Sequence, residues 1–485
     1  GFFFFFFPAL GMVSSLWLIA ATFPTGLSVP VYPKTVLSNG VLDVTVYLPS
    51  DAGYYNSTRF DWGSMIGTIK MGDAEFLSDV WRSPLDPNWG KDQDPTNPES
   101  VLGLASEFGC GSDGPDCPPG WGLHEDQTAS NGLLGYKEAG LGEPFLKIGV
   151  GKLKKGSCEW TWNGHTCETD TNYHFNSRYQ FVEAPVWTVT HPSNDALDLE
   201  HSASLGPWGY RLHRHLKVIG NTLVVRSELT NIGSKAFSTV QYTHNFLAFN
   251  GHLIGAPLTL QFGQDLSSYH EPGNEQGWSV PLDVHFAYTA PNRWTLAENL
   301  PQGAVARQSI LTQFEGARNL NASGGYIASL GNTAMASVLL NGKKPLYGYK
   351  FFAQASAACP EPLQQISLAP AQTTRWEQRL AFSLQGTAAA VSSFFTGVGS
   401  DVGENRQCGA QPSSSAVVKE ASSLEMCMTH CLLYLNCKGL QYEHSAKRCE
   451  LWTRSDVSSS RAKMGYYCLK LITSEGSIGS TPEMG

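Results

Sequence analysis

Between residues 31 and 385, hydrophobic and polar positions alternate with the period of two that is typical of β-strands. β-branched and aromatic residues occupy every second position in short runs that are bounded by turn-forming residues. The clearest runs are residues 41–47, 65–70, 221–229 and 238–246. No stretch of this part has a convincing helical period, so the pattern predicts a sandwich of many antiparallel strands.

The composition supports a large sandwich with a second, smaller domain. Charged residues make up 15% of the 485 residues, and the chain holds 49 Gly and 27 Pro; average soluble proteins are about 25% charged. A chain of this length exceeds one ordinary core. Residues 86–131 are rich in Pro, Gly and Asp and contain Cys110 and Cys117, so we expect one long loop there. Cys158 and Cys167 could close another loop.

The formal charge of −9 is spread along the chain without an acidic tail or a basic stripe. This distribution argues against nucleic acid as a partner. The sequence also has no dinucleotide-binding or phosphate-loop motif, so we expect no cofactor.

Residues 1–30 form an apolar leader without any charged residue. Its apolar core after Met12 has the length of a signal peptide and is shorter than the about 20 residues that span a membrane. We therefore expect a secreted or lumenal protein, with membrane anchoring as the alternative if the leader stays uncleaved. The sequons at Asn56 and Asn321 would be glycosylated only in an exported chain.

The C-terminal part is dense in cysteine. Six of the eleven cysteines fall between residues 408 and 468, and such density predicts a disulfide framework rather than a zinc site, because no paired C-x2-C occurs. Residues 422–435 predict a helix that puts Cys427 and Cys431 on one face. We expect a linker at 386–407, a module at 408–470 and a disordered tail at 471–485.

The cysteine spacing C-x3-C-x5-C from Cys427 to Cys437, followed by Lys-Gly-Leu-Gln-Tyr442 and Cys449-Glu-Leu-Trp452, resembles a PAN/Apple module, a small α+β fold. Spacing alone leaves 15 connectivities open. The resemblance implies three bridges: Cys408–Cys468, Cys427–Cys449 and Cys431–Cys437. It also implies a protein or glycan partner for the module.

The larger domain, residues 31–385, resembles the galactose mutarotase-like (aldose 1-epimerase-like) superfamily. Six stretches carry the resemblance in order along the chain, namely 53–62, 107–109, 145–151, 241–246, 359–362 and 367–376. The resemblance implies a supersandwich of antiparallel sheets that binds sugar.

Interconversion of sugar anomers needs one acid, to protonate the ring oxygen, and one base, to take the proton of the C1 hydroxyl. No metal is required. His244 shares a strand face with Val240, Tyr242 and Phe246; by itself this pattern is typical of a core histidine, and the resemblance makes His244 the candidate acid. Glu361 lies between two prolines, a pattern common in exposed turns, and the resemblance makes it the candidate base.

Three further residues are candidates for sugar binding. Glu107 stands in the region where the resembling epimerases carry a second histidine, and Arg59 could hold a sugar oxygen or form a structural ion pair. Tyr179 could stack on a sugar face.

The sequence thus favours a carbohydrate-binding isomerase that interconverts sugar anomers. Two alternatives stay open: a carbohydrate-binding or adhesion protein without turnover, and a polysaccharide-cleaving enzyme of the same fold.

Overall fold

The computed structural model describes residues 32–51, 53–77, 103–109, 132–160, 173, 178–250, 255, 258–262, 279–280, 286–290, 293–296, 305–311, 325–340, 348–354, 357–397, 404–408, 416–434, 437–453 and 460–471. The leader at 1–30, the sequon at Asn321 and the cysteines Cys110, Cys117 and Cys167 lie outside these residues. Within them, no helix is long and apolar enough to cross a membrane.

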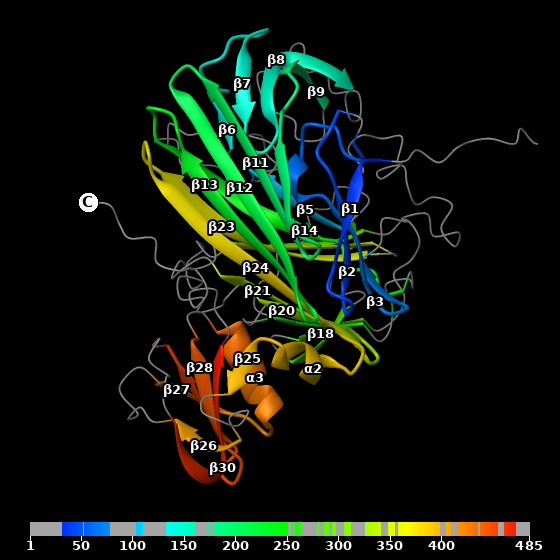
Figure 1. The fold of residues 1–485 in the computed structure, drawn as a ribbon, viewed down its shortest axis with the longest axis vertical. Coiled ribbons are helices and arrows are strands. Elements are labelled where there is room, and N and C mark those ends of the chain that lie inside the picture. The colour runs from blue at the N-terminus through cyan, green and yellow to red at the C-terminus, as the bar shows by residue number, and fades with distance from the viewer. Residues whose placement is uncertain are drawn as a thin grey trace, which may run out of the picture.

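Most described residues belong to strands, and two large sheets stack to form the sandwich seen in Figure 1. The first sheet runs in the order β1-β2-β3-β5-β14-β23-β22-β19-β16, with β4 paired to β3. Its strands are β1 Lys34–Ser38, β2 Asp43–Tyr47, β3 Ile66–Met71, β4 Ala74–Leu77, β5 Leu104–Phe108, β14 Phe237–Asn245, β16 Ser279–Val280, β19 Val305–Leu311, β22 Gly348–Gln354 and β23 Ala357–Leu368.

The second large sheet runs in the order β10-β11-β12-β13-β24-β21-β20-β15-β18-β17. Its strands are β10 Thr188–Ser193, β11 Ala196–Leu205, β12 Trp208–Ile219, β13 Thr222–Asn231, β15 Thr259–Phe262, β17 Phe286–Ala290, β18 Arg293–Leu296, β20 Tyr326–Leu330, β21 Thr333–Leu340 and β24 Thr373–Ser383. Both sheets are antiparallel except where β16 pairs with β19. The predicted antiparallel β-sandwich is confirmed.

A third, four-stranded sheet closes one end of the sandwich. It is formed by β6 Leu133–Leu134, β7 Pro144–Lys147, β8 Gly151–Trp160 and β9 Arg178–Glu183. Its aromatic residues build a core of their own, separate from the main core between the two large sheets. Cys158 on β8 is in a disulfide whose partner lies outside the described residues.

The sequence pattern missed one central strand. Residues 86–131 were expected to be a single loop, yet β5 lies inside that range and pairs with β14 over five residues. All five residues of β5 are buried. A strand that is buried on both faces shows no alternation of polar and apolar residues, which is why the pattern did not reveal it.

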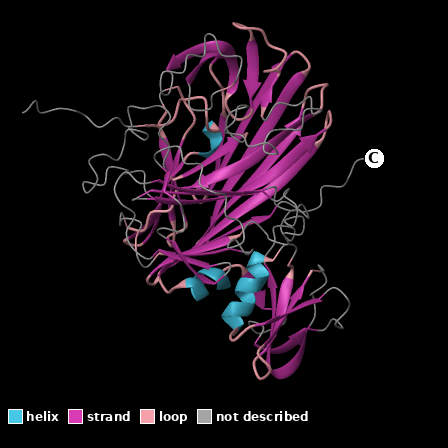
Figure 2. Cartoon of the chain, turned by 180° about the vertical axis from the view of Figure 1, so that it is seen from behind, coloured by secondary structure: helices cyan, strands magenta, loops and turns pink. Residues whose placement is uncertain are grey.

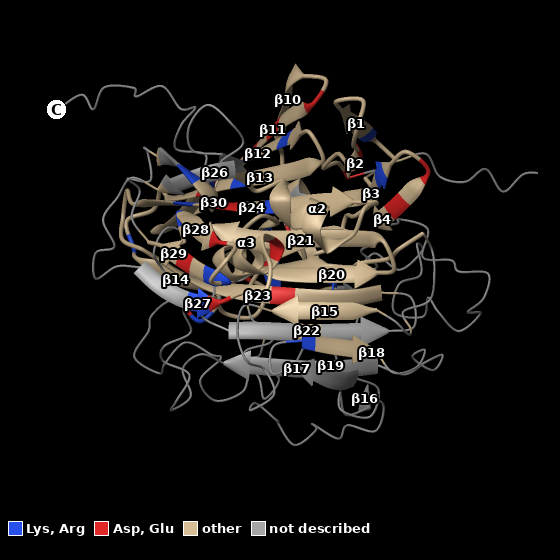
Figure 3. Cartoon of the chain, turned by 90° about the horizontal axis from the view of Figure 1, so that it is seen from below, with Lys and Arg blue, Asp and Glu red and all other residues tan. Residues whose placement is uncertain are grey.

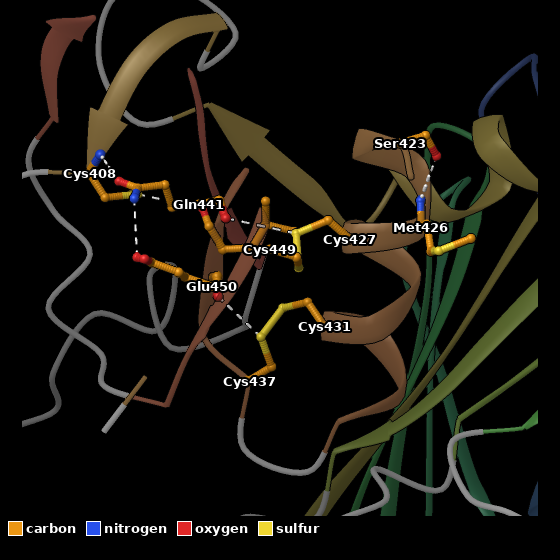
Figure 4. Close-up of a disulfide and its surroundings, with 11 residues drawn as sticks. Cys408, Ser423, Met426, Cys427, Cys431, Cys437, Gln441, Cys449 and Glu450 are labelled. Carbon is orange, nitrogen blue, oxygen red and sulfur yellow. Dashed lines mark hydrogen bonds between the residues drawn. A yellow bond between two sulfur atoms is a disulfide. The ribbon is translucent and has the colours of Figure 1, made fainter. Parts of the chain in front are cut away.

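The C-terminal module is a six-stranded sheet with one helix packed against it. Its strands are β25 Phe395–Gly397, β26 Glu404–Cys408, β27 Ala416–Glu420, β28 Gly439–Glu443, β29 Arg448–Trp452 and β30 Ser460–Leu471, and its helix is α3 Leu424–Leu433. Ser423 caps the helix by accepting a hydrogen bond from the amide of Met426 (Figure 4).

Three disulfides hold this module together, and Figure 4 shows Cys427 of α3 joined to Cys449 of β29 and Cys431 of α3 joined to Cys437, which comes just before β28. They are Cys408–Cys468, Cys427–Cys449 and Cys431–Cys437. These are the pairs that the PAN/Apple resemblance implied. Such bridges are typical of proteins that fold in an oxidising compartment.

Part of the expected linker at 386–407 is folded. Residues Thr387–Ser392 form helix α2, and β25 and β26 join the module's sheet. Figure 2 shows the helices α2 and α3 at the junction between the module and the sandwich, and in the view from below in Figure 3 they lie in front of the second large sheet, whose strand β21 contacts α2. One hydrophobic cluster runs from Val338 of β21 through Val391 of α2 to Leu432 of α3, so the module shares its core with the sandwich.

Candidate functional site

Two neighbouring strands of the first large sheet bring the candidate acid and the candidate base together. β14 and β23 pair antiparallel. The isolated bridge between Leu247 and Ala358 continues their register, which puts His244 opposite Glu361. Side chains of directly opposed residues lie on the same face of a sheet and within reach of each other. Tertiary pairing therefore joins two residues that are far apart in the chain.

The segment around Glu361 is a strand, not the exposed turn that Pro-Glu-Pro commonly forms. Pro360 and Pro362 have no backbone N–H to give to the ladder. Asn245 adds a side-chain bond to this segment, because its Nδ2 donates to the carbonyl oxygen of Pro360 at 2.7 Å. The other side-chain atom of this amide, Oδ1, accepts a hydrogen bond from Gln378 of the second large sheet at 3.0 Å. Glu361 is thus mounted on a rigid part of the sandwich.

His244 has a polar neighbour at each ring nitrogen. Its Nδ1 lies 2.8 Å from Oε1 of Glu361. Its Nε2 lies 3.5 Å from Oε2 of Glu107 and 3.4 Å from a terminal nitrogen of Arg59. His244 is 7% exposed and Glu361 3% exposed. The imidazole therefore stands between two carboxylates in a nearly water-free environment.

Glu107 on β5 is the most tightly held carboxylate of the cluster. Its Oε2 accepts hydrogen bonds from Nε of Arg59 at 3.1 Å and from the hydroxyl of Tyr242 at 2.6 Å. The other oxygen, Oε1, is buried and has no hydrogen-bond partner among the described residues. The Nζ of Lys147 lies 4.0 Å from it. Oε1 of Glu107 is therefore in an ion pair with Lys147 but accepts no hydrogen bond from the described residues.

These contacts shift the pKa values of the cluster. Burial by itself raises the pKa of Glu107, but the charges of Arg59 and Lys147 and the bond to His244 outweigh burial and hold it well below its usual range. Burial lowers the pKa of His244, while Glu361 and Glu107 together raise it above its usual value. Burial and the charge of Glu107 raise the pKa of Tyr242. A cationic His244 between anionic carboxylates is the state that these contacts favour.

Residues 53–62 cover the outer side of this cluster. The hydroxyl of Tyr55 accepts hydrogen bonds from the amides of Arg59 and Phe60 at 2.9 and 2.8 Å, which shapes the segment. The ring of Phe60 meets the His244 ring edge-on, with centroids 5.0 Å apart. The side chain of Arg59 is 19% exposed, so it is the part of the cluster that reaches solvent.

The structure brings together four of the five residues that the sequence singled out for catalysis or sugar binding: Arg59, Glu107, His244 and Glu361. Tyr179 lies elsewhere. Its ring is 1% exposed and stacks on Tyr173 in the core of the four-stranded sheet, with centroids 5.0 Å apart. Asn56, the sequon residue within the described part, is half-buried in the segment that covers the site.

Three members of the cluster were not predicted as site residues from the sequence: Tyr242, Lys147 and Cys359. Tyr242 and Cys359 each stand two positions before a candidate residue on the same strand, and period two puts them on the same face. Cys359 is fully buried, and its Sγ donates to Oε1 of Glu361 at 3.0 Å. Lys147 lies on β7, a strand without any candidate residue, so the period of two did not indicate it.

Comparison with known proteins places the C-terminal module in a family. Residues 404–470 match the PAN domain family, and these residues are a PAN domain. No curated protein matches the chain.

The larger domain is similar to several solved structures of low sequence identity. One is a galactose mutarotase-like protein from Lactobacillus casei, at 10% identity and a TM-score of 0.37 over 72% of this chain and 99% of that chain. Another is a galactose mutarotase-like protein from Clostridium acetobutylicum, at 11% identity and a TM-score of 0.36 over 72% and 94%. A third is a GH36 α-galactosidase from Geobacillus stearothermophilus, at 11% identity and a TM-score of 0.33 over 74% and 42%.

Proposed function

We propose that the larger domain binds an aldose and interconverts its anomers, with His244 as general acid and Glu361 as general base. One observation carries the proposal: the cross-strand pairing of β14 and β23 holds the two functional atoms, Nδ1 and Oε1, 2.8 Å apart. The ring oxygen and the C1 hydroxyl of an aldose are attached to the same carbon. An acid and a base that serve both oxygens must therefore lie close together.

The proton transfers follow from this arrangement. The His244 imidazolium gives a proton to the ring oxygen while the Glu361 carboxylate takes the proton of the C1 hydroxyl, and the ring opens. After rotation about C1–C2 the same two groups reverse their roles and the ring closes. Each residue ends in its starting state, so the cycle needs no outside proton carrier.

Glu107 and Arg59 support the acid and orient the sugar. The carboxylate of Glu107 faces Nε2 of His244 and favours its cationic form. Oε1 of Glu107, which accepts no hydrogen bond within the described part of the chain, would accept a sugar hydroxyl, since a buried acceptor without a hydrogen bond costs free energy. Arg59 would donate to a sugar oxygen at the solvent side of the cluster.

A second candidate function is sugar binding without turnover. The observation in its favour is the chemistry of Glu107, which stands where the resembling epimerases carry a second histidine. Because Arg59 keeps this carboxylate ionised, Glu107 accepts hydrogen bonds but donates none. If the reaction needs a second donor to the sugar, the domain binds but does not convert it.

Polarimetry on freshly dissolved α-glucose or α-galactose separates the two functions. Active protein speeds the relaxation of optical rotation above the spontaneous rate in buffer. His244→Gln and Glu361→Gln should each slow the catalysed rate by about 10²–10⁴-fold. His213→Gln and Glu228→Gln, which change partly exposed residues of the second large sheet, serve as matched controls and should leave the rate unchanged.

If the wild-type protein binds these sugars but leaves the rate of relaxation at the spontaneous value, the binding function replaces the isomerase. If the two site variants are as active as the controls, the assignment of acid and base is wrong.

Export of the protein is the third part of the proposal. The disulfide-bonded PAN domain suits an extracellular or lumenal location, and the apolar leader would be removed as a signal peptide. N-terminal sequencing of the secreted form should find a start between residues 21 and 31. Recovery of the intact leader in the membrane fraction would mean an anchored protein. The PAN domain would add a protein or glycan partner.

A further inference from the structure

Three side chains with different metal-binding atoms converge at the centre of the cluster. Sγ of Cys359 lies 3.0 Å from Oε1 of Glu361 and 3.8 Å from Nδ1 of His244, and the last two atoms are 2.8 Å apart. All three residues are buried. Cys359 and Glu361 stand two positions apart on β23, and His244 faces them from β14. The three donor atoms therefore come from the rigid centre of one sheet.

We propose that His244, Cys359 and Glu361 bind one divalent cation of the Zn²⁺ class through Nδ1, Sγ and Oε1. A thiolate, an imidazole and a carboxylate are the ligands that zinc takes in proteins, and three such ligands leave a fourth position for water or another ligand. This proposal goes beyond the sugar chemistry and does not rest on it.

The distances suit a metal after a small movement of one side chain. In a tetrahedral site with ordinary zinc–ligand bonds, the donor atoms are about 3.4–3.6 Å apart. The separation of Nδ1 and Sγ is close to that value at 3.8 Å. Oε1 of Glu361 lies nearer to both because it is hydrogen-bonded to them. A rotation of Glu361 that moves Oε1 by about half an ångström would open the site.

The surroundings of His244 match those of a metal-ligating histidine. Such histidines usually donate their other ring N–H to a carboxylate, which fixes the tautomer and the ring orientation. Here Nε2 faces Oε2 of Glu107 at 3.5 Å. Glu107 is in turn held by Arg59 and Tyr242. Nδ1 is therefore the nitrogen left for a metal.

Cys359 is available as a metal ligand because it is not in a disulfide. It is the free cysteine among the described residues, whereas the other cysteines there are in disulfides. The chain has eleven cysteines, so full pairing within one chain is impossible. A fully buried thiol between a histidine and a carboxylate is shielded from oxidation, which would let a thiol persist in an exported protein.

Metal uptake leaves the net charge of the buried cluster unchanged. The thiol proton of Cys359 and the Nδ1 proton of the His244 imidazolium leave for solvent as the cation enters. Two positive charges replace two protons, so no uncompensated charge is added to a buried site. Because Nδ1 is then a ligand, the metal-bound protein cannot use it as an acid, and metal would block sugar isomerisation at this site.

The test measures binding of the metal alone to the full-length protein after treatment with a chelator. Titration with Zn²⁺ against a chromophoric competitor should give one site per chain. Co²⁺ should give the charge-transfer band in the near ultraviolet that requires a thiolate ligand. Cys359→Ser should abolish that band and weaken Zn²⁺ binding by more than about 100-fold, and Glu107→Gln should weaken it by about 10–100-fold.

A matched control removes two histidines that share a carboxylate outside the cluster. His213 and His215 both contact Asp198 on the second large sheet, at 3.1 and 2.9 Å. The double variant His213→Gln/His215→Gln should keep full binding and the cobalt band. If Cys359→Ser does not fold, the cobalt band of the wild-type protein and the count of sulfur ligands by X-ray absorption at bound zinc still decide the question. The proposal is overturned if the wild-type protein gives no thiolate band, if zinc there has no sulfur ligand, or if Cys359→Ser binds zinc as tightly as the wild type.

Discussion

Replacement of Asp61 should cost the sandwich more stability than replacement of its partner Arg214. The two side chains form an ion pair between the sheets and are 1% exposed each, with Nε of Arg214 2.8 Å from Oδ2 of Asp61. Ser227 accepts a further hydrogen bond from Arg214 at 2.7 Å. Asp61 also anchors the segment that covers the candidate site, because its Oδ1 accepts the amide of Gly63 at 2.9 Å.

The stability costs of the two variants differ because a buried carboxyl can become neutral when its partner is removed, whereas a buried guanidinium cannot. Asp61→Asn leaves a buried guanidinium that cannot lose its proton, and an uncompensated buried charge costs about 3–5 kcal/mol. Arg214→Met leaves a carboxyl whose pKa is already raised by burial despite the arginine. Asp61 can then become neutral by taking up a proton. At neutral pH the cost of Arg214→Met should therefore be smaller.

The stability loss of Arg214→Met should depend on pH, because the Asp61 carboxyl can take up a proton. A carboxyl with a folded-state pKa above its unfolded value stabilises the protein at low pH, and this stability is lost as the pH rises through the folded-state pKa. Arg214→Met should accordingly lose less stability relative to wild type at pH 5 than at pH 8. Asp61→Asn has no titrating group at this place, whereas the raised pKa of the wild-type carboxyl makes the wild type lose stability as the pH rises. The loss of Asp61→Asn relative to wild type should therefore not grow between pH 5 and pH 8.

The assay is urea unfolding followed by tryptophan fluorescence, with the double variant Asp61→Asn/Arg214→Met completing a thermodynamic cycle. The double variant should recover most of the loss of Asp61→Asn, since no charge remains buried. The reasoning is refuted if Asp61→Asn costs less than about 1 kcal/mol, which is the range of exposed ion pairs. It is also refuted if the double variant is as unstable as the sum of the two single variants.

Three further predictions concern stability. Burial lowers the pKa of His201 to about 4, whereas an exposed histidine has a pKa of about 6.5. The protein should therefore lose about 3 kcal/mol of stability as the pH falls from about 6.5 to 4; His201→Gln should remove this loss in acid unfolding curves, and the exposed control His191→Gln should not. Ser423→Ala removes the cap of α3 and should lower the stability of the PAN domain by about 1 kcal/mol in thermal melts. Replacement of Cys427 and Cys449 together by Ala should cost about 2–4 kcal/mol, and a melt unchanged from wild type would contradict it.

A disulfide-bonded module between residues 408 and 468 could be predicted from the cysteines alone. Six cysteines within a short stretch indicate a disulfide-bonded module because a small unit has too little core to be stable without bridges. The pairing of Cys427 with Cys449 could not be predicted from the spacing of the cysteines, because that spacing leaves many connectivities open. It came from the resemblance, and in the structure α3 and β29 bring these two sulfurs together.

The strands with one face in the core could also be predicted from local sequence. In β12, for example, buried and less buried residues alternate along the strand. Because side chains alternate between the two faces of a strand, this burial pattern can be predicted from the alternation of apolar and polar residues in the sequence. β5 carries no such mark because both of its faces are covered. Helix α2 could not be predicted from the sequence either, because its apolar face is made of small residues. This face is buried only in the core that it shares with β21 and α3.

For the candidate site, too, one part could be predicted from the sequence and the other depends on the tertiary structure. Local pattern put His244, Tyr242 and Phe246 on one face of a strand, since side-chain direction depends only on strand period. The meeting of His244 with Glu361, Cys359 and Glu107 depends on which strands are neighbours and in what register they pair. Those contacts join distant parts of the chain through backbone hydrogen bonds that no local window of sequence contains. The tertiary structure alone therefore decided that an imidazole, two carboxylates and a thiol lie together in one buried cluster.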